Sequence, residues 1–338
     1  MARFIKTLKK TALAASIASL ATVANATIVT SIKPLGFIAS SIADGVTDTE
    51  VLVPAGASPH DYSLKPSDIQ KLQGAELILW VGEDIDAFLD KTLRPMPFKK
   101  VLSIADFAEI GGLLEGEAHD HKHEHDHDHT HKHDHAHKHD HDHKHDHAHK
   151  HDHDHKHDHA HEHDHDHSTN WHVWYSPEIS KIVATRLATR LTEAYPEKKA
   201  KIAQNLAEFN RTLAEQSEKI KQQLAPVKEK GFYVFHDAYS YFNNAYGLKQ
   251  TGYFTINPLV APGAKTLAKI KQEIKAHKVN CLFAEPQFTP KVIESLSKGT
   301  GVHVGRLDPM GDAVKLGVNS YANFLQYTAD SYFACLSK

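Results

Sequence analysis

A run of alternating histidines is the first candidate for metal chemistry in this sequence. Every odd-numbered position from His119 to His167 is histidine, which accounts for twenty-five of the thirty histidines in the chain. The twelve residues HKHDHAHKHDHD begin at His131 and follow twice more, the last time with a glutamate at Glu162. Neutral imidazole is a common metal ligand, so we expect this tract to bind metal ions. Whether this tract is the principal metal site depends on the positions of the other five histidines.

The composition of the tract, residues 119–167, argues against a folded strand. Three alanines are its only apolar side chains, and it holds fourteen Asp or Glu against six Lys. Such a segment buries too little apolar surface to offset the entropy lost on ordering, so we predict that it is disordered.

Five histidines lie outside the tract, and three of them occupy positions typical of a ligand site. His60 stands in PAGASPHDYSLKPSD, His172 in NWHVWYSP and His236 in VFHDAYSYF. His60 and His236 follow predicted strands, and in open α/β sheets ligands bind beyond the carboxyl ends of the strands. His277, in the last turn of a predicted helix, and His303, in a predicted strand, are expected to be structural.

The elements that must position these residues alternate between short apolar runs and helical patterns, which indicates an α/β fold with parallel sheets. We predict strands at residues 28–32, 50–53, 77–81, 101–104, 232–235, 281–284 and 302–305. We predict helices at residues 35–43, 66–73, 84–93, 239–246, 263–276, 290–298 and 319–336.

A long helical stretch separates the two sets of strands. Ser176 is a good N-cap with Pro177 at the first helical position, so a helix is expected from there to Ala194. A second helix is predicted at 196–225 and would be roughly 45 Å long. It could join two lobes as a stiff spine, or it could be a surface helix of one domain.

The N-terminus indicates export. Residues 1–26 combine four positive charges, a short apolar stretch and the sequence Ala24-Asn25-Ala26, which together are typical of a cleavable signal peptide. An exported protein can form disulfides. We therefore expect Cys281 and Cys335 to form a disulfide rather than to be two unrelated buried thiols. Without its signal and tract the chain is nearly neutral, and no basic patch of a nucleic-acid-binding protein is visible.

Several of these segments occur in the order found in one family. GASPHDYSLKPSD, the histidine tract, NWHVWYSP, VFHDAYSYF, FAEPQF and GRLDPMG together make the chain resemble the periplasmic zinc-binding protein of bacterial high-affinity zinc uptake ABC transporters. The resemblance covers essentially all of the mature chain. It implies two similar lobes joined by a rigid helix, with zinc held between them by His60, His172 and His236. It also implies the same pairing of Cys281 with Cys335.

The expected organisation follows from this resemblance. The first lobe would comprise residues 27–118 and 168–195, interrupted by the tract at 119–167. The linking helix would be 196–225, and the second lobe 226–338. The partners would be a zinc ion and the membrane permease and ATPase subunits of an ABC importer. We expect a monomer that binds no nucleic acid.

The metal and the fourth ligand need separate consideration. Manganese-binding relatives have a carboxylate at the position of His236, whereas three neutral imidazoles suit Zn²⁺. Some zinc-binding relatives have Glu directly before the first histidine, but Pro59 stands there in this chain. The fourth ligand is therefore expected to be Asp308, in GRLDPMG, or a water molecule.

Other functions remain open at this level. A three-histidine zinc with an open position could catalyse hydrolysis, with Glu285 or Asp237 as the base, although the sequence has no H-E-x-x-H motif. The tract alone could make the chain a metal buffer, and a role as a surface adhesin is neither supported nor excluded. We expect a binding protein rather than an enzyme.

Overall fold

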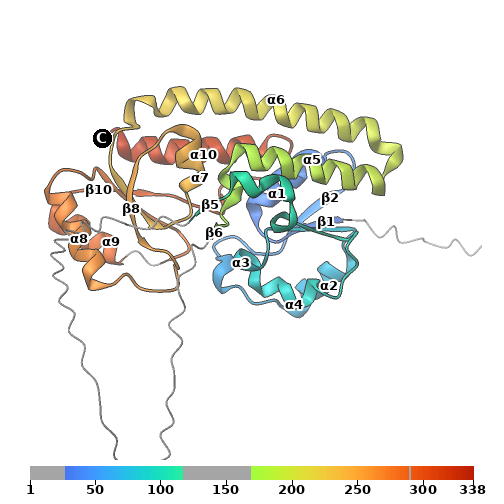
Figure 1. Ribbon diagram of the computed structural model, residues 1–338, viewed down its shortest axis with the longest axis horizontal. Helices are drawn as coiled ribbons and strands as arrows, with labels where there is room; N and C mark the ends of the chain where they lie inside the picture. Colours follow the sequence, from blue (N-terminus) through green and yellow to red (C-terminus); the bar gives the residue numbers. More distant parts are fainter. Residues whose placement is uncertain (1–26, 117–168, 289–290) are drawn as a thin grey trace, which may run out of the picture.

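The computed structural model describes residues 27–116, 169–288 and 291–338. The predicted signal peptide and the histidine tract lie outside the described residues. Figure 1 shows two sheets in two lobes, with a long helix running above both. The predicted α/β architecture with parallel sheets is therefore confirmed.

The first sheet has the strand order β2-β1-β3-β4, and all neighbouring strands are parallel. Its strands and helices are β1 (Thr27–Thr30), α1 (Lys33–Ile42), β2 (Asp48–Val51), α2 (Pro66–Gly74), β3 (Leu77–Trp80), α3 (Glu83–Asp86), α4 (Asp90–Leu93) and β4 (Val101–Ser103). Every residue of β3 is buried. Parallel strands covered on both faces read as continuous apolar runs, which is why β3 was predictable from the sequence.

The single helix predicted at residues 84–93 is wrong. The segment forms α3, a 3₁₀ turn at Ala87–Leu89 and then α4. The backbone leaves helical geometry at Asp86, with φ −106° and ψ 40°. The Asp86 carboxylate turns inward and accepts hydrogen bonds from the Ser31 hydroxyl (2.7 Å) and the Val81 amide (2.8 Å). This buried side chain competes with the helical pattern and breaks it.

The second sheet has the order β10-β9-β7-β8 and is also parallel. Its elements are β7 (Phe232–His236), α7 (Ser240–Tyr246), β8 (Gln250–Thr255), α8 (Ala264–Lys275), β9 (Cys281–Ala284), α9 (Lys291–Thr300), β10 (His303–Arg306) and α10 (Ser320–Leu336). Strand β8 was not predicted because it lies at the edge of the sheet, is only partly buried and contains Gly252. A Cβ at Gly252 would lie 2.6 Å from the Tyr233 ring, so glycine is required there.

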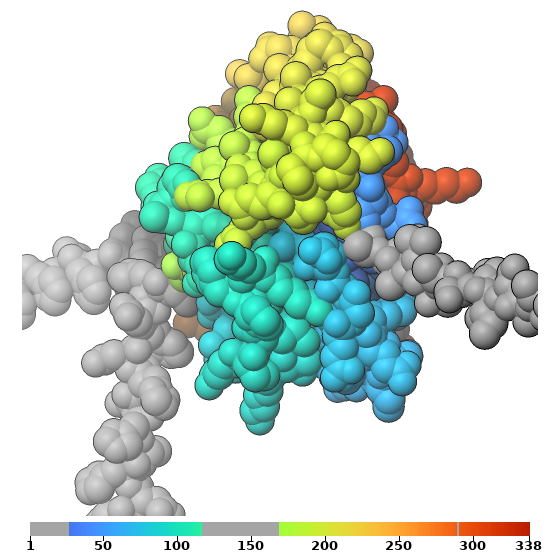
Figure 2. Space-filling view, turned by 90° about the vertical axis from the view of Figure 1, so that its right-hand side faces the viewer, coloured from blue at the N-terminus to red at the C-terminus, as the bar shows by residue number. Residues whose placement is uncertain are grey.

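Two long helices lie over the sheets. Helix α5 (Pro177–Ala194) begins at Ser176, whose hydroxyl accepts a hydrogen bond from the Ile179 amide (3.2 Å). Helix α6 (Lys199–Leu224) follows a 3₁₀ turn at Pro196–Lys198. In the end-on view of Figure 2, α5 and α6 form the ridge above the first lobe. In Figure 1, α6 continues over the second lobe as well.

One hydrophobic cluster spans the two lobes, and each lobe also has a smaller cluster of its own. Buried residues of β1, α1, α5, α6, β7, β9 and α10 form a single continuous cluster. Phe324 of α10 packs against Phe37 of α1, with ring centroids 5.3 Å apart, and stacks on Tyr175, at 5.1 Å. Farther along α10, Tyr332 packs against Phe232 of the second sheet, at 5.2 Å. Helix α10 therefore joins the lobes together with α6, and we propose that the lobes fold as one unit.

A short antiparallel pair, β5 (Glu115–Gly116) and β6 (Thr169–Asn170), brings the two sides of the tract together. Within the described residues, no helix has the length and apolar character needed to span a membrane.

The predicted disulfide is confirmed. Cys281 at the start of β9 is bonded to Cys335 near the end of α10, with their Cα atoms 6.2 Å apart. Both side chains are buried. The bond fixes the closing helix, which contacts both lobes, to the second sheet.

Reduction of this disulfide should lower the free energy of unfolding. The bond joins residues 54 positions apart, and a cross-link over a loop of that length restricts the unfolded chain by about 4 kcal/mol. Urea unfolding of the oxidised and the phosphine-reduced protein, followed by tryptophan fluorescence, measures the difference with identical side chains. Equal free energies in the two forms would contradict a stabilising role.

Candidate metal centre

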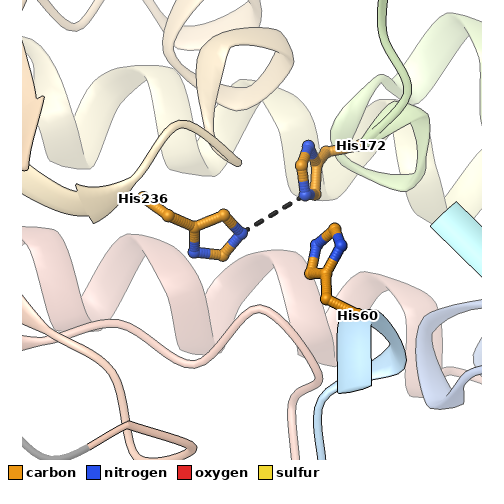
Figure 3. A group of neighbouring side chains, drawn as sticks. All are labelled: His60, His172 and His236. Carbon is orange, nitrogen blue, oxygen red and sulfur yellow. Dashed lines mark hydrogen bonds between the residues drawn. The ribbon is translucent and has the colours of Figure 1, made fainter. Parts of the chain in front are cut away.

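Three histidines distant in sequence meet between the lobes. His60, His172 and His236 point toward one another from separate segments (Figure 3). One nitrogen of each ring lies within 4.8 Å of the other two. Among the described residues, these three histidines are the group of side chains close enough together to hold one metal ion. The structure therefore brings together the three histidines that the sequence singled out.

His60 is positioned by the loop that follows β2. It lies in the 3₁₀ turn Pro59–Asp61, and its backbone amide donates to the Ser58 hydroxyl (3.3 Å). Upstream in the loop, the Gly56 amide donates to the Asp312 carboxylate at 2.6 Å. The turn thus presents the imidazole toward the second lobe.

His172 stands between β6 and a 3₁₀ turn at Val173–Tyr175. Its side chain is buried, and its Nδ1 lies 2.8 Å from the Asn170 Oδ1 atom. The next aromatic residue, Trp174, packs against the His172 ring and donates its indole N–H to the Pro309 carbonyl (3.1 Å). This indole holds the turn against the loop that follows β10.

His236 is the last residue of β7, and Glu285 directly follows the neighbouring β9. Adjacent parallel strands end at the same edge of a sheet, so the two side chains meet. His236 Nδ1 lies 2.7 and 2.8 Å from the two Glu285 carboxylate oxygens. The Tyr239 hydroxyl also donates to Glu285 (2.9 Å). This carboxylate orients the ring in the way that carboxylates orient metal-binding histidines.

These partners determine which nitrogen of each ring is free. A carboxylate oxygen and an amide oxygen can only accept, so Nδ1 is the protonated nitrogen in both His172 and His236. The two Nε2 atoms are 3.3 Å apart, and in the neutral form of each ring this nitrogen carries the lone pair. Two lone pairs repel, whereas a cation placed between them would attract both. The arrangement is that of a cation site.

Burial favours the neutral forms of His60 and His172. Desolvation, reinforced by the nearby His236, lowers the pKa of His60 from 6.5 to about 4. The pKa of His172 also lies well below its ordinary value because the ring is fully desolvated and faces His236 and His60. Only a neutral imidazole can ligate a metal, so these groups are ready to bind at neutral pH.

The space between the rings is small. The cavity they line has a volume of about 10 Å³, which suits one ion or water molecule and no organic substrate. Both residues considered as the catalytic base of a hydrolase make hydrogen bonds to other side chains. Glu285 is bound to His236 and Tyr239, and Asp237 accepts a hydrogen bond from Gln250 (3.2 Å).

Asp308 lies near this cavity and has three hydrogen-bond donors. Its Oδ1 accepts from the Gln287 side chain (2.8 Å) and from the Met310 amide (3.0 Å). Its Oδ2 accepts from the Asp312 amide (2.7 Å). Asp308 thereby connects the loop after β9 with the loop after β10. Its role as the fourth ligand stays a prediction.

The other two histidines of the described residues lie outside the cluster. His277 follows α8 with a left-handed backbone (φ 56°), and His303 begins β10 as an exposed residue. Asn170, which orients His172, was not predicted from the sequence. Its position two residues before a candidate ligand was the available signal.

Comparisons with known proteins identify the family of the chain. Residues 28–335 match the family described as "ZnuA: Zinc-uptake complex component A periplasmic". The chain is 68% identical over 335 residues to the High-affinity zinc uptake system protein ZnuA of Haemophilus influenzae, covering 98% of this chain and 99% of that protein. A protein of the same name from Haemophilus ducreyi is 56% identical over 330 residues, with 98% and 99% covered.

A solved structure described as "Crystal structure of ZnuA" has the same fold. It aligns with a TM-score of 0.68 and 23% identity, covering 92% of this chain and 98% of that chain.

The metal-free protein should lose stability as the pH falls from 6.5 toward 4. His60 and His172 have lowered pKa values when folded but ordinary values near 6.5 when unfolded, so the unfolded state binds more protons in this window. Their neutral forms favour the folded state fully above pH 6.5, and this contribution is lost progressively below it. Urea unfolding at a series of pH values, in the presence of a chelator, measures the effect.

The matched control is the double variant His60→Asn and His172→Asn. It retains the histidine tract and should show a flatter dependence of unfolding free energy on pH. An equally steep dependence in both proteins would assign the effect to other groups.

Proposed function

Because the chain belongs to the periplasmic family of zinc-uptake component A proteins, we propose that it captures Zn²⁺ with high affinity in the periplasm and delivers it to an ABC importer. Zinc is the cargo of this protein. The proposed ligands are His60, His172 and His236, with Asp308 or a water molecule in the fourth position. The partners would be the permease and ATPase subunits of the importer, and the chain would act as a monomer.

The observation that carries the proposal is the spacing of the two convergent nitrogens. In a tetrahedral site with Zn–N bonds of about 2.05 Å, two ligand nitrogens lie about 3.3 Å apart. The Nε2 atoms of His172 and His236 are separated by 3.3 Å. This spacing supports a zinc site at the pair.

The chemistry of the donors favours zinc over manganese. Imidazole nitrogen suits Zn²⁺, whereas Mn²⁺ prefers carboxylate, carbonyl and water oxygen. The three gathered ligand atoms of the described residues are all imidazole nitrogens. Glu285 supplies a negative charge behind His236, where it increases the basicity of the ring without contacting the ion.

The order of events follows from the same residues. The ion would lose its water on entering the small cavity, and the neutral rings of His60 and His172 would replace that water without first releasing protons. His172 and His236 keep their orientation through Asn170 and Glu285. Zinc release to the importer would require the separation of at least one imidazole from the other two.

We further propose that the histidine tract, residues 119–167, collects zinc for this site. Its many nearly equivalent imidazoles can bind several ions, but each ion must order a segment of chain, which weakens binding relative to a preformed site. The tract would raise the local zinc concentration and pass ions to His60, His172 and His236.

Replacing His60, His172 or His236 with Ala should weaken zinc binding by about 100-fold or more, because even the partners that orient metal ligands contribute 10–100-fold. Chelator competition in a protein lacking residues 119–167 measures this without interference from the tract. The exposed His277→Ala and His303→Ala variants are matched controls and should bind as the parent does. Parental affinity in all three cluster variants would rule out this ligand set.

The variant Asp308→Ala, measured in the same assay, tests whether Asp308 is the fourth ligand. If water completes the site, the loss should be clearly smaller than for the histidine variants. A loss of the same size would indicate that Asp308 ligates the ion.

Deletion of residues 119–167 should remove weak zinc binding and leave one tight event. Calorimetry at about pH 7.5 should show one tight event and several weaker ones for the full chain, since its histidines are then neutral. Repeating the titration below about pH 6 should suppress the weak events in the full chain, because protonated imidazole cannot ligate. Loss of the tight event on deletion would make the tract the principal site.

A further inference from the structure

Asn170 connects the two lobes at the metal centre. It is the last residue of β6, is 1% exposed and lies two residues before His172. Its Oδ1 atom accepts from the His172 backbone amide (3.1 Å) and pairs with the His172 Nδ1 (2.8 Å). The carbonyl oxygen of the Asn170 side chain therefore fixes both the turn and the ring of His172.

The other half of the Asn170 amide reaches the second lobe. Its Nδ2 donates to the backbone carbonyl of Asp237 (2.9 Å) and lies 3.3 Å from the Ser240 hydroxyl. Asp237 is the residue that directly follows His236. A single buried amide thus bridges the ring of one candidate ligand and the backbone beside another.

A second contact reinforces this bridge. The Tyr241 hydroxyl of α7 donates to the Asn170 backbone carbonyl (2.6 Å) and accepts from the Glu115 amide (3.0 Å). The β5–β6 pair that carries Asn170 is therefore bound to α7 as well. His60, by contrast, reaches the site on the loop after β2. Among the hydrogen bonds of the described residues, none joins this loop to Asn170 or to α7.

We propose that Asn170 is a positioning residue that holds His172 and His236 together as a preassembled pair, to which His60 is added as the third ligand. This inference rests on the zinc-binding function proposed above. The bridge accounts for the approach of the two Nε2 atoms to 3.3 Å. The hydrogen bonds of one buried amide hold the two rings at this distance.

The role requires the chemistry of asparagine. One oxygen must accept from His172 while one N–H group donates to the Asp237 carbonyl. An ionised aspartate could accept but could not donate, and alanine could do neither. Asparagine is also neutral, so it orients His172 without adding a second buried negative charge beside Glu285.

The test compares three variants in the protein lacking residues 119–167. Asn170→Ala removes both halves of the bridge, and Asn170→Asp retains the acceptor for His172 but loses the donor to Asp237. Asn244→Ala is the control, because Asn244 of α7 donates to the Glu115 side chain (2.7 Å) and so joins the same two elements away from the ligands. Zinc affinity is measured by chelator competition, and the ligand field by the visible spectrum of bound Co²⁺.

Asn170→Ala should weaken zinc binding 10–100-fold, the range typical of residues that orient metal ligands, and should change the Co²⁺ spectrum. Asn170→Asp should restore the Nδ1-protonated form of His172, seen by ¹⁵N NMR of the ring, without restoring the affinity. Asn244→Ala should retain both the affinity and the spectrum of the parent.

Parental affinity in Asn170→Ala would overturn the proposal, and full affinity in Asn170→Asp would reduce Asn170 to an orienter of one ring. If Asn170→Ala does not fold, the nearly isosteric Asn170→Asp decides by itself. Failure of the parent to bind zinc tightly would instead overturn the proposed function, so the two outcomes are distinct.

Discussion

The candidate metal centre depends on hydrogen bonds made at the rear of two imidazole rings. Glu285 and Asn170 hold the Nδ1 protons of His236 and His172, and this turns both Nε2 lone pairs toward one point. A buried lone pair that has lost its water is unfavourable unless it gains a new partner, and a cation bound by both nitrogens would be such a partner. The rest of the protein must therefore provide enough stability to hold them there.

That stability comes from a hydrophobic cluster that extends across both lobes. Phe324 and Tyr332 on α10 pack against side chains of the first and the second lobe respectively, and the Cys281–Cys335 bond fixes the end of the same helix. Helix α6 lies along both lobes, with its apolar stripe buried against this core. Two independent lobes would have to be brought together by the metal. Here the shared core already places the ligands from both lobes within reach of one another.

The two classes of histidine in the chain illustrate the effect of preorganisation. The tract holds twenty-five histidines, against three in the candidate metal centre. By the proposal above, each ion bound in the tract would have to order a polar segment. The fold positions His60, His172 and His236, and burial keeps His60 and His172 neutral down to a lower pH than an exposed histidine. We therefore expect these three ligands to bind zinc more tightly than those of the tract.

Local patterns in the sequence predicted most of the parallel strands, the capped helix α5 and the three histidines that meet between the lobes. Those features depend on local patterns: apolar runs, the N-cap at Ser176, and polar residues placed at the ends of strands. Tertiary structure alone decided the features that depend on distant partners. The helix predicted at 84–93 is broken because Asp86 turns toward Ser31, and β8 forms although Gly252 weakens its strand pattern. The bridge from Asn170 to Asp237 likewise joins residues 67 positions apart, which no local periodicity records. A sequence pattern shows which side chains can ligate a metal, but the direction of each lone pair is set by hydrogen bonds that exist only in the folded chain.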